Sequence, residues 1–125
     1  MNLSRIIKLS RDRKKNEQCT KSFHIAWIFR KNKVISVASN RLKSHPKKNQ
    51  YNYKKFSTGV CAELRAVLKA RRDDFSGCKI IILRIDNNNE LAYSRPCIGC
   101  IDMIQKLDFS RAFYSNSKGG FESLK

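Results

Sequence analysis

The most constraining feature of the sequence is the run Cys78–Ile85 (CKIIILRI), in which nearly every side chain is apolar. Turn-forming residues flank this run, with Gly77 before it and Asp86-Asn87-Asn88-Asn89 after it. A strand with one face in water alternates apolar and polar residues, whereas a continuous apolar run needs cover on both faces. The run therefore predicts an interior strand of a sheet with helices on both sides.

The other segments supply the helices and strands that such a sheet requires. Apolar residues at helical spacing predict helices within residues 1–16, over Cys61–Asp74 and from Pro96 to Asp108. Runs rich in β-branched and aromatic residues predict strands at Phe23–Arg30, Val34–Ser39 and Arg111–Asn116, the first two forming a hairpin. Residues 91–94 suit a short strand or loop, and the tail after Asn116 has a weak helical tendency. The order of elements predicts an α/β fold, a sheet flanked by helices.

Length and charge limit the class of protein. The chain has 125 residues, so we expect a single domain over 1–125. It carries 27 Lys and Arg against 10 Asp and Glu, a net charge of +17. This excess attracts anions such as nucleotides or nucleic acid. An AT-rich genome, which encodes many Lys and Asn residues, would produce the same bias without selection for binding.

Membrane and secretion signals are not apparent in the sequence. No apolar run approaches the roughly 20 residues of a transmembrane helix, and the N-terminal stretch is too polar for a signal peptide. We therefore expect an intracellular, cytoplasmic protein that does not bind membranes. In that reducing setting its cysteines are expected to be metal ligands or thiols rather than disulfides.

Residues 40–58 (NRLKSHPKKNQYNYKKFST) lack any apolar period and predict a long loop. A loop of this length in a small domain is usually functional. It has six basic residues, no acidic one, and three aromatic residues, Tyr51, Tyr53 and Phe56. Aromatic rings among lysines are typical of surfaces that bind single-stranded nucleic acid. Alternatively, the rings anchor the loop, and His45 either contacts a phosphate or base or is a solvated loop residue.

Cysteines stand at the start of two predicted helices. Cys97 and Cys100 are three residues apart, so both sulfurs lie on one helix face, where the positive end of the helix dipole favours thiolates. A Cys-x-x-Cys by itself also suits a redox pair or two core residues. Cys61 adds a third thiolate, and Glu63 adds a carboxylate two residues later. Three protein ligands leave one zinc position for water, and an adjacent carboxylate can move protons.

The arrangement Cys61-Ala62-Glu63, then 32 residues, then Pro96-Cys97-Ile98-Gly99-Cys100 resembles the cytidine and deoxycytidylate deaminase superfamily. That family has His or Cys-x-Glu followed by Pro-Cys-x-x-Cys. The resemblance covers about residues 23–116. It implies a three-layer α/β/α fold with a mixed central sheet, a bound Zn²⁺, and hydrolytic deamination of a cytosine-type base.

The resemblance also implies roles for individual residues. Cys61, Cys97 and Cys100 would hold zinc, and Glu63 would be the catalytic proton shuttle. Asn40, at the end of the second predicted strand, corresponds to an Asn that contacts the nucleoside in the family. The backbone N–H of Ala62 would contact the base or the tetrahedral intermediate. The stretch NRLKSHPKK, which includes His45, looks like the basic segment before the catalytic helix in viral and bacterial deoxycytidylate-type deaminases.

Two departures from the family pattern concern charge. Cys61 is the first ligand, as in many free-nucleoside deaminases, whereas many nucleotide and nucleic-acid members have His there. Three thiolates lower the Lewis acidity of zinc unless a cation compensates. Leu64 stands where nucleoside enzymes usually have Arg, so Arg65 and Arg95 are the candidates for charge compensation.

Three functions follow from these features. The first is deamination of a free nucleoside or nucleotide, cytidine, deoxycytidine or their monophosphates. The second is deamination of a base in single-stranded DNA or RNA, including tRNA, which the charge and the basic loop favour. The third is a non-catalytic zinc protein associated with nucleic acid, which Glu63 disfavours. The resemblance further implies a homo-oligomer, for which strand Phe23–Arg30 and the short tail are candidate contact surfaces.

Overall fold

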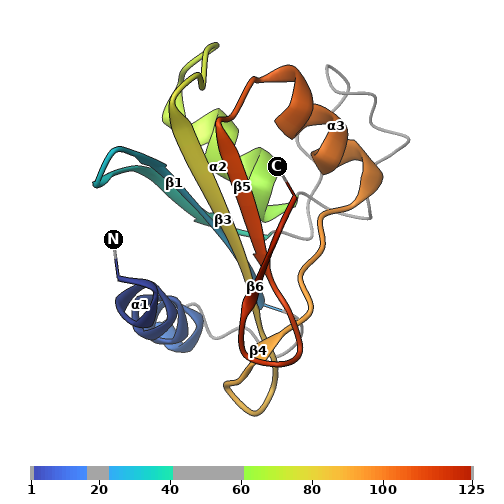
Figure 1. Ribbon diagram of the computed structural model, residues 1–125. Coiled ribbons are helices and arrows are strands. Elements are labelled where there is room, and N and C mark those ends of the chain that lie inside the picture. Colours follow the sequence, from blue (N-terminus) through green and yellow to red (C-terminus); the bar gives the residue numbers. More distant parts are fainter. Residues whose placement is uncertain (1, 17–22, 41–60, 125) are drawn as a thin grey trace.

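The computed structural model describes residues 2–16, 23–40 and 61–124 (Figure 1). Apart from Asn40, the predicted loop at 40–58 lies outside the described residues, and with it lie His45 and the three aromatic residues of that loop. In the described segments, no helix has the length and apolar character needed to traverse a lipid bilayer.

Three helices and six strands make up the described chain. In chain order they are α1 (Leu3–Asn16), β1 (Phe23–Arg30), β2 (Lys33–Ser39), α2 (Ala62–Ala70), β3 (Cys78–Ile85), β4 (Leu91–Ala92), α3 (Ile98–Lys106), β5 (Arg111–Ser115) and β6 (Phe121–Ser123).

The six strands form one mixed sheet in the order β2-β1-β3-β5-β6, with the short β4 paired to β3. β1 runs antiparallel to both β2 and β3. β3 and β5 are parallel, and α3 lies between them in the chain, as a parallel connection usually requires. The sheet is therefore mixed, as expected, and β3 is an interior strand.

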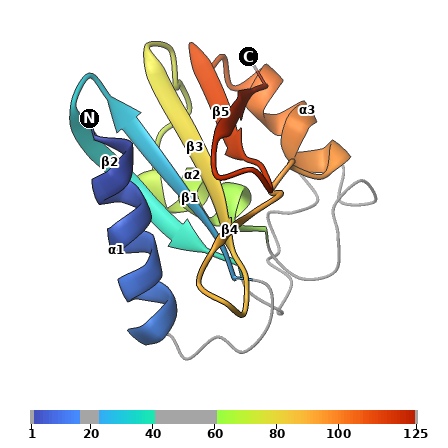
Figure 2. The same cartoon turned by 60° about the horizontal axis from the view of Figure 1, so that its bottom comes forward.

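Each face of the sheet has its own apolar core, because successive side chains of a strand point to opposite faces. From β3, Ile81 and Leu83 belong to the core beneath α1, whereas Ile80 and Ile82 belong to the core beneath α2 and α3. Figure 2 shows α1 on one side of the strands and α2 on the other. The predicted α/β architecture, with a sheet between helical layers, is confirmed.

The strand Phe23–Arg30 is not an exposed contact surface. It forms β1, which has β2 on one side and β3 on the other, and its burial is nearly complete. Trp27 is only 7% exposed, and its indole N–H donates to the Ser10 hydroxyl of α1 over 3.0 Å. The prediction that this strand forms a contact surface between subunits is wrong, because its aromatic side chains pack within the chain.

The helix predicted over Cys61–Asp74 is shorter than expected. It ends at Ala70, and Arg71 takes the left-handed conformation with φ 53°. The chain then turns so that Phe75, fully buried, stacks on Phe109 with ring centroids 4.8 Å apart. Burial of this aromatic pair outweighs the helix propensity of the residues between Ala70 and Asp74.

The weak prediction of a helix in the tail after Asn116 is also wrong. Phe121–Ser123 pairs with β5 as the antiparallel strand β6. The turn between them is held by Asn116, whose Oδ1 accepts from the backbone N–H groups of Lys118 (2.9 Å) and Gly120 (3.0 Å). Gly119 supplies the left-handed conformation of this turn, with φ 81°.

Candidate metal centre

Two of the three motif cysteines occupy N-cap positions. Cys61 precedes α2 and Cys97 precedes α3, both with extended backbone. An N-cap is usually Ser, Thr, Asp or Asn, whose side-chain oxygen accepts from a free N–H of the first turn. Within the described residues, neither cysteine makes such a capping bond. Both thiols instead lie at helix N-termini, where the dipole stabilises negative charge.

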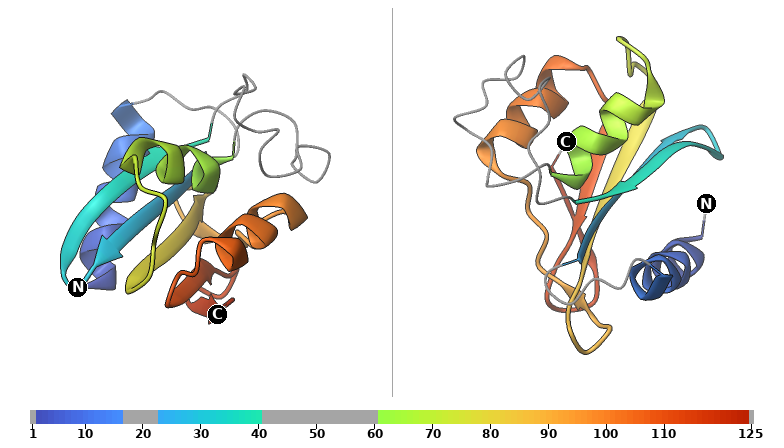
Figure 3. Two further views of the ribbon diagram at one scale, coloured as in Figure 1. Left: turned by 90° about the horizontal axis from the view of Figure 1, so that it is seen from above. Right: turned by 180° about the vertical axis from the view of Figure 1, so that it is seen from behind.

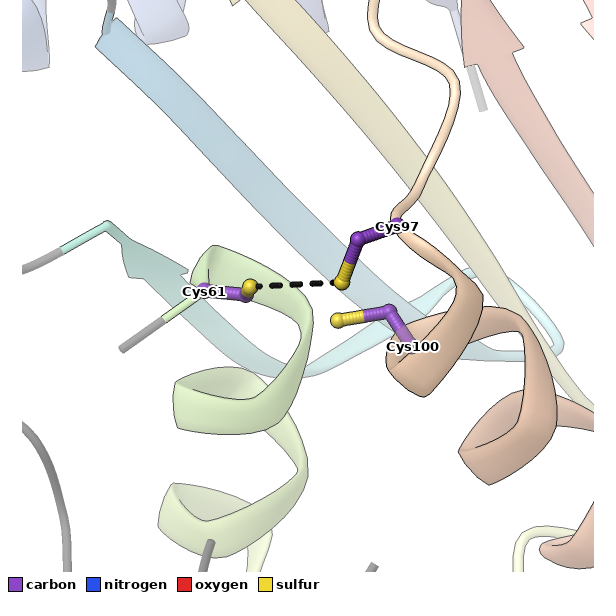
Figure 4. A group of neighbouring side chains, drawn as sticks. All are labelled: Cys61, Cys97 and Cys100. Atoms are coloured by element: carbon purple, nitrogen blue, oxygen red, sulfur yellow. Dashed lines mark hydrogen bonds between the residues drawn. The ribbon is translucent and has the colours of Figure 1, made fainter. Parts of the chain in front are cut away.

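The sulfur atoms of Cys61, Cys97 and Cys100 all lie within 4.8 Å of one another (Figure 4). The Sγ atoms of Cys61 and Cys97 are 3.7 Å apart. Ligands placed about 2.3 Å from a tetrahedral zinc ion are separated from one another by about 3.8 Å. The donor set and its spacing therefore fit a metal ion held by three cysteines.

Burial is uneven around this cluster. Cys100 is fully buried, whereas Cys61 and Cys97 are half-buried. The sulfurs come from two helices on the same face of the sheet and point toward one another in Figure 4. The cluster thus has one side packed in the core and another within reach of small solutes.

Contact with the other two thiols suppresses the ionisation of Cys100 when no metal is present. Hydrogen bonds with the thiols of Cys61 and Cys97, and then burial, raise the pKa of Cys100 well above its usual value. A divalent cation reverses this preference, because a coordinated thiol loses its proton. Metal binding at this cluster is therefore expected to release protons.

Glu63 lies against the same cluster. It is in the first turn of α2, is only 4% exposed, and hydrogen-bonds with the thiol of Cys100. Burial is the main cause that raises the pKa of Glu63 to about 7, and the bond with Cys100 opposes this rise. A buried carboxyl group that titrates near neutral pH is suited to accept and return a proton.

The other residues predicted to contact substrate have structural partners. The Oδ1 atom of Asn40 accepts from the backbone N–H of His24 over 3.2 Å, and the Asn40 N–H donates to the His24 carbonyl over 3.0 Å. Asn40 thereby continues the β1–β2 pairing past the end of β2. Ala62 is buried in the first turn of α2. Substrate contact by Asn40 and Ala62 stays a prediction, and His45 lies outside the described residues.

The two candidates for charge compensation bind oxygen atoms. Arg65 donates from Nη1 to the Ser39 carbonyl over 2.5 Å. Arg95 donates from Nη1 to the Tyr114 hydroxyl over 3.4 Å, with its guanidinium 5.9 Å from the centre of that ring. Their effect on the charge of the thiolate cluster stays a prediction.

One feature that sequence reasoning missed is a basic groove beside α2, to which Arg65, Lys69 and Arg71 contribute. The four-residue spacing of Arg65 and Lys69 was a usable signal, since residues four apart share a helix face. The groove itself depends on β2, which the sequence does not place next to α2.

Comparison with protein-family models gives no match, and comparison with curated protein sequences gives no significant match. The resemblance to deaminases therefore rests on the motif residues, and what the described residues establish is a three-cysteine cluster with the geometry of a metal site.

Proposed function

We propose that this protein is a zinc-dependent deaminase that converts a cytosine-type base to the uracil type in a free nucleoside or nucleotide, with water consumed and ammonia released. The observation that carries the proposal is the meeting of three cysteine sulfurs with the buried carboxyl group of Glu63. A structural zinc site usually has four protein ligands, whereas a catalytic site has three and an open position.

The three cysteines would hold the ion, with Cys61 from the start of α2 and Cys97 and Cys100 from the start of α3. Zinc held there supplies the Lewis acidity that makes water a nucleophile at neutral pH. The buried position of Cys100 anchors one side of the site in the core, so the substrate approaches from the side of Cys61 and Cys97.

Glu63 would carry the protons of the reaction. Its carboxylate takes a proton from the attacking water and delivers it to the ring nitrogen of the base. It then transfers the second proton of that water to the amino group, which leaves as ammonia when the C–N bond breaks. Its buried position beside the three sulfurs lets the same carboxyl group act first as base and then as acid within one turnover.

Asn40 and Ala62 would position the substrate. Asn40 is held at the end of β2 through both its backbone and its side chain, so its amide has a defined orientation. Ala62 lies in the first turn of α2, where backbone N–H groups lack partners within the helix and can meet a base carbonyl. The first part of the motif has Cys rather than His (Cys61-Ala62-Glu63), and this form supports a free nucleoside or nucleotide as substrate.

The test is an ammonia-release assay of the zinc-loaded protein with cytidine, deoxycytidine and their monophosphates. We expect turnover by the parent protein. We expect Glu63→Gln to lower kcat by at least about a hundredfold, because this substitution removes general acid–base catalysis. Zinc content measured on the same samples should be unchanged, since Glu63 is not a ligand.

A variant on the opposite face of the sheet serves as the control. Asp12→Asn makes the corresponding carboxyl-to-amide change at an exposed position of α1, and its turnover should equal that of the parent. Full activity of Glu63→Gln would reject the mechanism. A zinc-loaded parent protein that is inactive on every substrate would favour the non-catalytic alternative.

A further inference from the structure

A groove of about 460 Å³ runs between α2 and the edge strand β2, away from the thiol cluster. Figure 3 (right) shows α2 lying alongside β2. The half-buried Leu68 and the cations Arg65, Lys69 and Arg71 line the groove, and the buried Ala38 of β2 lies at its base. Its volume lies in the range of sites that hold small organic ligands.

Two of the cations bridge the helix and the strand. Arg65 donates to the Ser39 carbonyl, and Lys69 donates from Nζ to the Val37 carbonyl over 3.2 Å. These bonds cover carbonyl groups on the open edge of the sheet, which discourages pairing with another strand. They also hold two positive charges in fixed places along one wall, so the groove has a defined row of cations.

Arg71 extends this row past the end of the helix. Its left-handed backbone turns the chain there, and its side chain is exposed. Among the described residues that line the groove, none is acidic. The one acidic residue within α2, Glu63, is buried and faces the thiols, so it does not neutralise the row.

We propose that this groove binds single-stranded nucleic acid, with its phosphates at Lys69 and Arg71 and its sugars and bases against Leu68. Cations that follow one another beside a half-buried apolar side chain match a chain that presents both phosphates and base faces. A duplex buries its base faces, and a free mononucleotide has phosphate at one position only. This binding activity is separate from the chemistry of the metal centre.

The groove and the metal centre lie along the same helix, α2. Lys69 follows Cys61 by eight residues, which is about 12 Å along a helix. A strand lying in the groove therefore runs along α2 toward the helix end that carries Cys61. If the metal centre deaminates a base, the groove would place a polynucleotide beside it, and this connection rests on the proposed function.

The test measures binding rather than turnover. The probe is a fluorescein-labelled oligothymidine of about 15 nucleotides, a length that covers a typical single-strand site and contains no cytosine. Fluorescence anisotropy gives its Kd at several salt concentrations. We expect the double variant Lys69→Gln/Arg71→Gln to bind about tenfold more weakly, because phosphate contacts are lost. The slope of log K against log salt should decrease by about 0.7 per lost contact, or about 1.4 in all.

A matched variant controls for net charge. Lys8→Gln/Lys15→Gln removes the same two charges from exposed positions of α1, on the opposite face of the sheet. Its Kd should stay within about twofold of the parent value if binding is local. Equal losses in both variants would show diffuse attraction to a basic protein and would overturn the proposal. Thermal unfolding of both variants verifies that they are folded.

Competition separates the classes of ligand. Unlabelled oligothymidine should displace the probe, whereas duplex DNA of equal length and deoxycytidine monophosphate should compete weakly. The assignment to single strands would be overturned if duplex DNA or deoxycytidine monophosphate competed as well as oligothymidine. It would also be overturned if the parent protein did not bind the probe. Zinc content and nucleoside turnover are measured on the same samples. A parent protein that turns over nucleosides but does not bind the oligonucleotide rejects only the groove, and a parent that binds the oligonucleotide without turnover rejects only the deaminase.

Discussion

At the scale of single residues, the two N-cap cysteines are informative because they are poor helix caps. Ser or Asp at Cys61 or Cys97 would satisfy a backbone N–H group that, within the described residues, the thiol side chain does not. A serine at such a position typically stabilises a protein by about 1 kcal/mol relative to a residue that cannot cap. Cysteine at both positions is explained by sulfur chemistry rather than by helix stability.

Cys97→Ser should have opposite effects on zinc binding and on stability. We expect the zinc content to fall well below that of the parent, because a hydroxyl group is a poor zinc ligand. The metal-free variant should be as stable as the metal-free parent, or more stable by up to about 1 kcal/mol, because serine caps α3. Elemental analysis and denaturant unfolding measure the two effects. Cys78→Ala, at a buried thiol outside the cluster, should keep its zinc, and equal zinc content in Cys97→Ser would contradict the site.

We expect His24 to contribute to the pH dependence of the free energy of unfolding. Burial, followed by the charge of Arg84, lowers its pKa below 6.5. The unfolded chain therefore binds the proton more readily, so stability falls as pH drops through 6.5 toward the lower folded value. His24→Gln should reduce this loss. Urea unfolding at pH 7.5 and 5.5, with chelator in all samples to exclude metal release, gives the comparison. The same pH dependence in parent and variant would show that His24 does not contribute.

At the scale of elements, boundaries follow from turns rather than from helix or strand propensity. α2 stops at Ala70 because Arg71 adopts a left-handed conformation and Phe75 must reach the core. β6 exists because the Asn116–Gly120 turn reverses the chain after β5. In both places, a single backbone conformation decides whether the following residues continue an element or begin a new one.

Alanine substitutions at the two glycines of the turn before β6 should have different effects on stability. A Cβ added at Gly119 meets no atom within 4 Å, but φ is 81°, where L-residues are strained. Gly119→Ala should therefore destabilise the protein by about 1 kcal/mol. Gly120 does not have positive φ, and an added Cβ makes an ordinary 3.6 Å contact with the Asn116 side chain. Gly120→Ala should change stability by less than Gly119→Ala in urea unfolding. Equal effects would indicate that backbone strain is not the cause.

At the scale of the whole molecule, the sheet brings distant cysteines together. Cys61 and Cys97 are 36 residues apart, and they meet because α2 and α3 pack on the same face. Leu64 from α2 and Met103 from α3, both fully buried, join one apolar core. That core sets the helix positions before any metal binds, so a metal ion would link helix ends that are already close together.

Zinc is therefore expected to stabilise the native state without being needed for folding. Free zinc at a hundred times its Kd stabilises a protein by about 2.7 kcal/mol if only the native state binds it. Thermal unfolding with zinc and with excess chelator should show a higher Tm with zinc and a cooperative transition in both cases. Cys97→Ser should show no such difference in Tm. A chain that is unfolded in chelator would contradict the view that the core alone sets the helices.

Local sequence patterns were sufficient for much of the fold and of the candidate site. The run Cys78–Ile85 forms the expected interior strand with the expected bounds, and β1 and the β1–β2 hairpin were also predicted. The three thiols were expected to converge, and they do so in the described structure. These predictions succeed because side-chain periodicity and residue spacing depend on neighbours in the sequence.

The sequence by itself determined most of the elements, the excess of positive charge and the identity of the three clustered cysteines, because these depend on side-chain chemistry and short-range spacing. Only the tertiary structure decided the strand order, the early end of α2, the strand at the tail and the groove between α2 and β2. Each of these depends on which distant residues exclude water together. That choice follows from the packing of the whole chain and cannot be read from any single segment.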